Sequence, residues 1–328
     1  MKKIIKKFRN KLIGTDLSNM NNVINKLLSQ QEKFLSQQEK SLSTQEKMKI
    51  LESNENSKFL LPLDYPPSSD YEPRYGYKKK LSNLDNFFSE FDDEIFEFLS
   101  ILKDLDYSKI PYNSDLDLKG FGDGPMNALD LICIMGIVKT YKPKKIIEIG
   151  SGISTHFFRR SINMFLNQEN CKLISIDPSP RIEIKDISDE IFYSFIEDLD
   201  LDLFLNLQEN DIIFFDGSHR TFMNSDVTIF FLEILQMLKP GVIVHFHDIF
   251  LPEDYPTWSK SYYWNEQYML AVYLMENLNK KNFEFIFPIN WITKQKKFNI
   301  KNKFIIDFKD GQRNRYIEKG GSFWFKKK

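Results

Sequence analysis

The sequence predicts an α/β fold of the Rossmann-like type, a mostly parallel sheet with helices on both faces. Three observations predict it. From about residue 126 onward, short apolar segments alternate with segments of helical periodicity. A glycine-rich turn joins the first of these apolar segments to the next helix. Acidic and imidazole side chains directly follow the later apolar segments. Continuous apolar strands of this kind are typical of a parallel sheet buried on both faces.

The elements follow from the period of the apolar residues along the chain. We expect helices over residues 84–105, 128–141, 155–166, 226–238 and 266–277. We expect strands over residues 145–149, 173–176, 191–196, 211–215, 242–246, 283–287 and 322–325, the late ones including an antiparallel strand. The Rossmann-like domain therefore takes residues 126–328.

Two extensions precede that domain. Residues 1–60 begin with the basic stretch MKKIIKKFRNKL and contain a seven-residue repeat that starts at Leu28, Leu35 and Leu42. The repeat predicts a short coiled coil and so a homo-oligomer, and the alternative is a lone polar spacer helix. The basic stretch is either a solvated terminus or a peripheral membrane contact. Residues 61–125 form an irregular and helical extension that ends in the turn FGDGP.

Composition excludes several classes of protein. The formal net charge is −1 over 328 residues. The overall charge of the protein therefore does not favour binding to nucleic acid or to an anionic membrane. No apolar run is long enough to span a membrane, and no secretory signal follows the charged N-terminus. Cys133 and Cys171 lie in apolar runs and are expected to be buried free thiols. We therefore expect a cytoplasmic location and no nucleic-acid partner.

The glycine-rich turn lies in the segment KKIIEIGSGIST. Glu148 stands near the end of the strand, and Gly150, Ser151 and Gly152 follow it at the start of the helix. A dinucleotide fingerprint would have a third glycine where Thr155 stands. An acidic residue beside the turn would also repel a pyrophosphate, whereas it suits the ammonium of a methionine moiety. The turn thus favours S-adenosylmethionine over NAD, and the alternative is an ordinary strand–helix turn.

Polar side chains also follow the other strands. Asp177 ends the next strand, where a carboxylate can accept hydrogen bonds from ribose hydroxyls or can cap a helix. Two later strands run into IIFFDGSH and VIVHFHDIF. Because ligands bind outside the carboxyl ends of parallel strands, we expect one group of polar residues to gather there: Asp216, His219, His245, His247 and Asp248.

Residues 112–328 resemble the class I S-adenosylmethionine-dependent methyltransferases, and most closely their bacterial family 24-like group. The resemblance rests on segments that occur in one order and spacing: FGDGPMNALD, IIEIGSGIST, ISIDPSPR, IIFFDGSH, NSDVTIFFLEILQMLKPGVIVHFHDIFLPEDYP, WNEQYML and GSFWF. The first 60 residues lie outside it.

The resemblance implies roles for single residues. The turn residues would contact the methionine part of the cofactor, Asp177 the ribose, and Asp198 the neighbourhood of the adenine. Asp216 and Asp248 stand where related O-methyltransferases bind a divalent metal such as Mg²⁺. His247 stands where such enzymes often carry a second acidic residue, so metal dependence stays open. The expected cofactor-binding residues are Glu148, Gly150, Ser151, Gly152, Asp177, Asp198 and Asp216.

The expected function is O-methylation of a sugar or another small hydroxylated acceptor. We expect His219, His247 and Asp248 to be the catalytic residues, with one histidine or a metal on Asp216 and Asp248 helping the acceptor lose its proton. The aromatic stretch DYPTWSKSYYWNEQY is either a cover for the acceptor or part of the core. Two alternatives remain: a non-catalytic scaffold assembled by the coiled coil, and a metal-dependent hydroxylase on the same fold.

Overall fold

The structure is a computed structural model of the whole chain. It describes residues 72–76, 79–105, 126–166, 170–278, 282–300, 305–306, 315–316 and 319–328, together with Asn25, Leu28 and Ser29. Residues 72–328 form one compact unit. The predicted coiled coil lies outside the described residues except for those three, which are helical and exposed where burial is described. The turn FGDGP also lies outside. Among the described residues, no helix is long and apolar enough to cross a membrane.

A seven-stranded sheet forms the centre of this unit, in the order β3-β2-β1-β4-β5-β9-β6. Parallel pairing joins β3 to β2, β2 to β1, β1 to β4 and β4 to β5, whereas β9 runs antiparallel to both its neighbours. The strands are β1 (Lys145–Ile149), β2 (Lys172–Ile176), β3 (Glu190–Phe192), β4 (Ile212–Phe215), β5 (Ile243–Phe246), β6 (Phe283–Pro288) and β9 (Phe323–Lys327). The Rossmann-like prediction with a late antiparallel strand is thereby confirmed.

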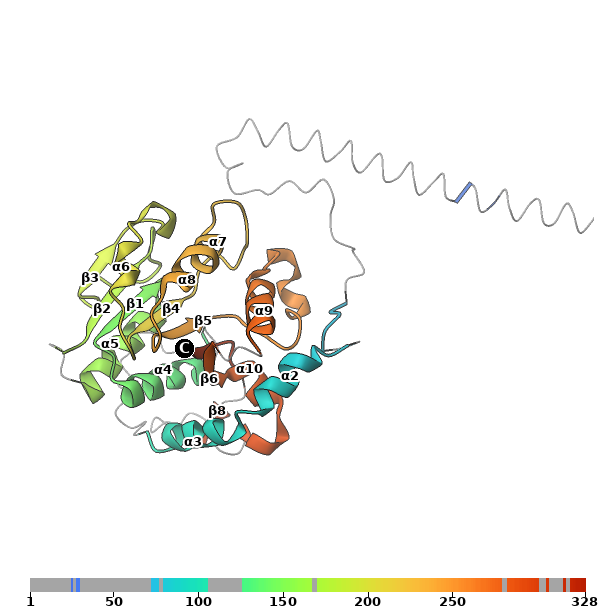
Figure 1. The fold of residues 1–328 in the computed structure, drawn as a ribbon, viewed down its shortest axis with the longest axis horizontal. Coiled ribbons are helices and arrows are strands. Elements are labelled where there is room, and N and C mark those ends of the chain that lie inside the picture. The colour runs from blue at the N-terminus through green and yellow to red at the C-terminus, as the bar shows by residue number, and fades with distance from the viewer. Residues whose placement is uncertain are drawn as a thin grey trace, which may run out of the picture. The chain divides into compact units, whose positions relative to one another are not determined.

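Helices lie on both faces of the sheet (Figure 1). On one side are α3, α4 and α5, and on the other are α7 and α8. Their bounds, and those of the remaining elements, are α2 (Ser82–Ser89), α3 (Asp92–Lys103), α4 (Ala128–Tyr141), α5 (Ile153–Phe165), α6 (Asp202–Leu205), α7 (Asp226–Ile229), α8 (Leu235–Met237), α9 (Glu266–Asn277), α10 (Ile289–Lys294), the 3-10 turns η5 (Ile196–Asp198), η7 (Thr257–Tyr262) and η8 (Lys296–Phe298), the π-turn η6 (Phe230–Ile234), and a small hairpin of β7 (Ile305–Ile306) and β8 (Arg315–Tyr316).

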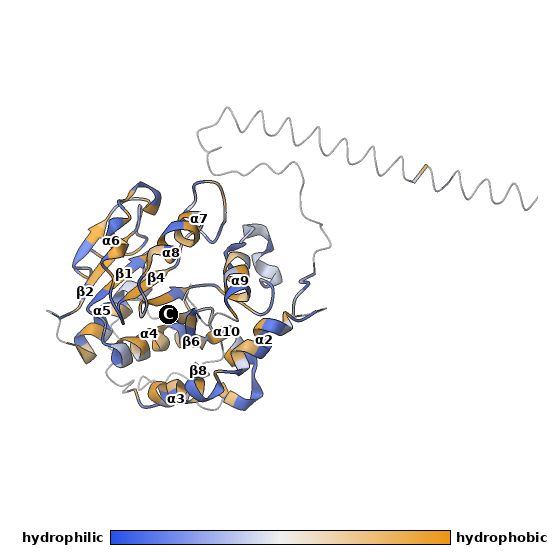
Figure 2. Cartoon of the chain, viewed as in Figure 1, coloured by the Kyte–Doolittle hydropathy of each residue, from blue (hydrophilic) through white to orange (hydrophobic). Residues whose placement is uncertain are grey.

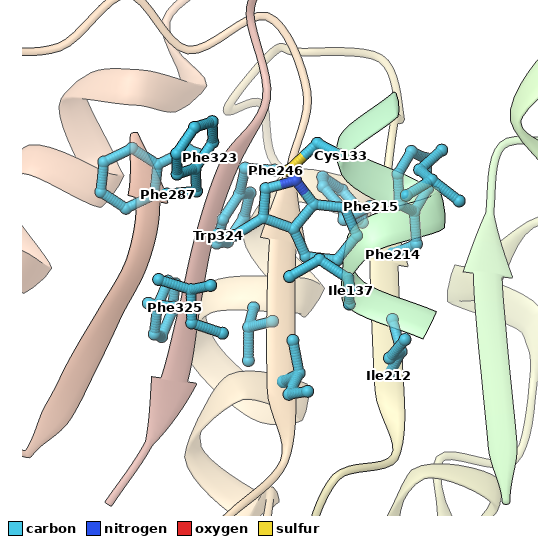
Figure 3. Packing of buried hydrophobic residues seen from close by; sticks show 14 of the residues in the cluster. Cys133, Ile137, Ile212, Phe214, Phe215, Phe246, Phe287, Phe323, Trp324 and Phe325 are labelled. Carbon is cyan, nitrogen blue, oxygen red and sulfur yellow. The ribbon is translucent and has the colours of Figure 1, made fainter. Parts of the chain in front are cut away.

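Helix α4 is apolar around almost its whole circumference, as its colour in Figure 2 indicates. It lies between the sheet and α3, so both of its faces are buried. Gly136 permits the close approach of α3, because a Cβ at that position would lie 2.2 Å from Leu102 Cδ2. Phe214 of β4 and Trp324 of β9 pack on the face of the sheet that carries this helix, with ring centroids 5.8 Å apart (Figure 3). The core therefore fixes the strands whose carboxyl ends carry the candidate site.

Two expected elements differ from the structure. The helix expected over residues 84–105 is two helices, α2 and α3, which meet at Glu90 and Phe91. Three acidic residues open α3, and negative charge is stabilising at a helix N-terminus, so the run DDE starts a new helix. The strand expected over residues 191–196 ends at Phe192. The predicted domain boundary at residue 126 stays a prediction, although α2 and α3 belong to the same hydrophobic core as the sheet.

Candidate active site

The glycine turn joins β1 to α5 at the carboxyl edge of the sheet. Gly150 has a φ of +80°, a region that L-residues rarely adopt. A Cβ at Gly150 would lie 1.9 Å from the backbone oxygen of Asp216. The amide of Asp216 in turn donates to the Ile149 carbonyl at 2.9 Å. The turn after β1 and the start of the loop after β4 are therefore in direct backbone contact.

Substituting Gly150 with alanine is expected to destabilise the fold by about 2 kcal/mol or more, because strained φ and overpacking act together. The matched control is Gly152→Ala, since a Cβ there would meet nothing within 4 Å. Denaturant unfolding of both variants measures the difference. Equal stability of the two variants would contradict the contact with Asp216.

Glu148 is fully buried at the end of β1 and is surrounded by hydroxyl groups. Ser154 and Thr155 each donate to its carboxylate at 2.5 Å, and Ser175 donates at 3.2 Å. The amide of Gly152 donates to Thr155 Oγ1 at 2.9 Å, so the carboxyl group supports the turn from behind. Burial raises the pKa of Glu148 to about 8, against the effect of the hydroxyl donors. The direct cofactor contact predicted for Glu148 stays a prediction, whereas its contacts in the structure are those of a positioning residue.

Asp177 ties the end of β2 to the glycine turn. Its Oδ2 accepts from both the amide and the hydroxyl of Ser151, each at 2.8 Å. Its Oδ1 accepts from the amide of Ser179 at 2.8 Å. Asp177 is half-buried, so its carboxylate still borders solvent beside the open space at Gly152. Asp198, by contrast, is exposed at the end of η5, and its predicted place near an adenine stays a prediction.

The loops after β4 and β5 bring two carboxylates and two imidazoles together. Nε2 of His219 lies 3.4 Å from Asp216 Oδ1 and 3.7 Å from Asp248 Oδ2. Nδ1 of His247 lies 3.5 Å and 3.7 Å from the same two atoms. The side chains of Asp216 and Asp248 are 30% and 21% exposed, whereas both imidazoles are almost fully buried. The carboxylates are therefore the parts of this cluster that a ligand can touch.

Each charged group in this cluster changes the pKa of the others. Burial opposes a charge on His219, but Glu266, Asp216 and Asp248 outweigh it and raise the pKa of His219 to about 9. Burial likewise opposes a charge on His247, and Asp216 and Asp248 raise its pKa well above the usual range. Burial would raise the pKa of Asp216, yet His247 and His219 hold it well below the usual range. Both shifts favour the protonated imidazole, the form that cannot accept a proton from a substrate.

His245 does not join the cluster, although it shares a side of β5 with His247. Its ring is fully buried and stacks on Phe214 with centroids 3.7 Å apart and an interplanar angle of 4°. Trp324 covers it at 4.4 Å. Burial lowers the pKa of His245 well below its usual range. It is a neutral member of the core.

Sequence patterns did not identify two buried carboxylates behind the imidazoles. Glu266, at the start of α9, lies 3.1 Å from His219 Nδ1. Asp130, near the start of α4, has one oxygen 3.9 Å from His247 Nε2 and accepts from the amides of Gly321 and Ser322 with the other. Burial raises the pKa of Glu266 to about 7. In sequence both residues look like ordinary acidic residues in a first helical turn, which gave no signal of this role.

The cluster does not have the form of a metal centre. Within the described ranges, no three His, Cys, Asp or Glu side chains are placed so that they could hold one metal ion. The ring nitrogens of His219 and His247 face the carboxylates that the resemblance assigns to a metal. These residues therefore fit a network of carboxylate and imidazolium groups better than a resident divalent ion.

Comparison with solved structures finds several matches of low sequence identity. The SAH-bound methyltransferase PaMTH1 of Podospora anserina is 14% identical, covers 80% of this chain and 100% of its own, and has a TM-score of 0.37. The O-methyltransferase from Bacillus cereus in complex with SAH is 12% identical, with coverage of 75% and 97% and a TM-score of 0.37. The O-methyltransferase TomG from Streptomyces achromogenes, in complex with SAM, is 12% identical, with coverage of 74% and 95% and a TM-score of 0.36.

Comparison of the sequence with curated proteins finds no match. Comparison with family models does find one. Residues 147–249 match the family 24 model described as a methyltransferase domain. The matched range runs from β1 through β5 and includes the glycine turn and Asp177. It also includes the group formed by Asp216, His219, His247 and Asp248, which we call the acid–imidazole cluster. The chain therefore contains a methyltransferase domain of family 24.

Proposed function

We propose that this methyltransferase uses S-adenosylmethionine and transfers the methyl group to a hydroxyl of a sugar or another small hydroxylated acceptor. The observation that carries the proposal is the direct contact between the glycine turn and the loop that bears Asp216. This contact brings a place for a cofactor and a group of proton-accepting side chains to one edge of the sheet. Methyl transfer needs the two to be adjacent, because the acceptor oxygen attacks the methyl carbon in line with the departing sulfur.

The residues of the turn fit an adenosyl cofactor. The open space at Gly152 leaves room for a ligand close to the backbone. Beside it, the half-buried carboxylate of Asp177 can accept hydrogen bonds from vicinal hydroxyls. The bound cofactor would supply an electrophilic methyl group. This chain's residues would orient that group and exclude water from it.

The acceptor hydroxyl must lose its proton as the new C–O bond forms. We propose that the carboxylate of Asp248 accepts this proton, because it is partly exposed and burial raises its pKa. Asp216 stays ionised between the two imidazoles and can orient the hydroxyl. The imidazoles hold both carboxylates in place from behind. The proposal thereby keeps Asp248 as a catalytic residue and changes the role expected of His219 and His247.

We further propose that the reaction needs no divalent cation. Dialysis of the folded protein against EDTA is expected to leave methyl transfer within about twofold of the untreated rate. The physical reason is geometric: imidazole nitrogens of His219 and His247 lie 3.4–3.7 Å from Asp216 and Asp248, and no three such side chains of the described residues are placed to hold one metal ion. Loss of turnover on chelation, with recovery on adding Mg²⁺, would overturn this proposal and support a metal bound to the same carboxylates.

Calorimetric titration of the full chain with S-adenosylmethionine tests the cofactor. We expect binding, and we expect Asp177→Ala to weaken it at least tenfold, because the variant loses the ribose acceptor and the tie to Ser151. Asp186→Ala, an exposed change in the same loop, is the control. No binding to the folded wild type would refute the proposed function. Binding without S-adenosylhomocysteine production from any hydroxylated acceptor would support the scaffold alternative.

A further inference from the structure

An exposed aromatic corner lies beside the proposed active site. It consists of Trp258 and Tyr262 in η7 and of Trp264 just after it. Trp258 is 59% exposed and Tyr262 is 47% exposed, which is unusual for rings of this size. Trp264 joins the two: its ring lies 5.2 Å from that of Tyr262 at 20° and 5.6 Å from that of Trp258 at 89°. The corner thus presents two exposed rings supported by a third.

The corner is continuous with the acid–imidazole cluster. The ring of Trp264 lies 4.8 Å from that of His219, whose Nε2 faces both Asp216 and Asp248. Hydrogen bonds also join the two loops. Arg220 Nε donates to the Tyr262 carbonyl at 2.8 Å. Trp264 therefore connects the two exposed rings to the imidazole that faces both carboxylates.

The base of the corner is held by hydrogen bonds and ring packing. The amides of Asn265 and Glu266 both donate to the His219 carbonyl, at 2.9 and 3.3 Å. Buried Tyr255 packs against Trp264, and its hydroxyl accepts from the amide of Gln267 at 3.0 Å. Ordering exposed rings in advance lowers the entropy that a ligand loses on binding.

We propose that this corner is the acceptor subsite and that it binds a pyranose ring. The proposal rests on the function proposed above and narrows the acceptor to a carbohydrate. Indole and phenol rings offer flat apolar faces on which the C–H face of a sugar can lie. The nearby carboxylates of Asp216 and Asp248 accept hydrogen bonds, and a sugar offers them several hydroxyl donors. A simple phenol would stack equally well but has a single donor for two carboxylates.

Binding of defined glycosides tests the subsite. The probes are the methyl glycosides of glucose, mannose, galactose and rhamnose, with catechol as the non-sugar probe, titrated into the full chain in the presence of S-adenosylhomocysteine. Tryptophan fluorescence and calorimetry report binding. We expect at least one glycoside to bind, Trp258→Ala and Tyr262→Ala each to weaken it at least tenfold, and Trp258→Phe to retain most of the affinity.

Leu232→Ala is the control, because Leu232 is an exposed apolar residue in η6 that has no place in the proposed site. Far-ultraviolet circular dichroism checks the fold of each variant. The subsite proposal is overturned if no glycoside binds, if only catechol binds, or if the aromatic variants bind as tightly as the wild type. Titration with S-adenosylmethionine reports separately on the proposed function, and we expect the aromatic variants to leave that affinity unchanged.

Discussion

Replacing Asp248 with asparagine is expected to reduce kcat by a factor of roughly 10² to 10⁴, the usual range for loss of a general base. The variant has almost the same shape but cannot accept the proton of the acceptor hydroxyl. Asp248 has a φ of +54°, in the left-handed region, and asparagine is among the residues that tolerate this region best. The backbone should therefore be preserved, and the affinity for S-adenosylmethionine should change little.

Steady-state kinetics and calorimetry on the same preparation separate chemistry from binding. Asp202→Asn, an exposed change in α6, is the matched control and should retain the wild-type rate. A kcat for Asp248→Asn within threefold of the wild type would remove Asp248 from the mechanism. A loss of cofactor affinity equal to the loss in rate would instead show that the carboxylate binds the cofactor.

Local patterns in the sequence were sufficient to predict the strands of the sheet and most of the helices that cover it. The bounds expected for α4 and α9 are those observed, because each helix begins with a clear polar boundary after a loop. In α4 the amide of Asn127 donates to Asp130, a capping contact that the spacing of the two residues permits. The carboxyl ends of parallel strands meet at one edge, so the residues after β4 and β5 could be expected to converge.

The partners of the imidazoles could not be predicted in the same way. Glu266 follows His219 by 47 residues, and its contact depends on how α9 packs against the loop after β4. Asp130 reaches His247 from a helix that precedes the first strand. No periodicity within either segment encodes such a long-range contact. The raised pKa of His219 was therefore also outside what the sequence indicates, since its largest upward contribution comes from Glu266.

The burial of Glu148, in contrast, follows from the pattern of its own strand. The residue stands in the run KIIEI, and a strand that is apolar on both faces is buried on both faces. A glutamate within it points into the interior whichever face it takes. The hydroxyls of Ser154, Thr155 and Ser175 then explain how the carboxyl group is accommodated. The same buried environment makes the stability of the fold depend on pH.

Replacing Glu148 with glutamine is expected to change the pH dependence of stability. Burial raises the pKa of Glu148 in the folded chain to about 8, above its ordinary value of 4.5, so the fold favours the protonated form. The stabilisation that this provides is complete below pH 4.5 and is lost as the pH rises through 8. Relative to a variant that is neutral at every pH, the wild type should lose roughly 4 kcal/mol between pH 4.5 and 8.5.

Urea denaturation at pH 5, 6.5, 8 and 9 measures the difference in free energy of unfolding between the wild type and Glu148→Gln. The variant should become the more stable protein at pH 9, whereas the exposed control Glu90→Gln should follow the wild type at every pH. Parallel curves for Glu148→Gln would mean that the carboxylate is ionised in the fold and could attract the ammonium of a cofactor. A converging and crossing pair of curves, with cofactor affinity at pH 7 within threefold of the wild type, would instead establish Glu148 as the support of the glycine turn.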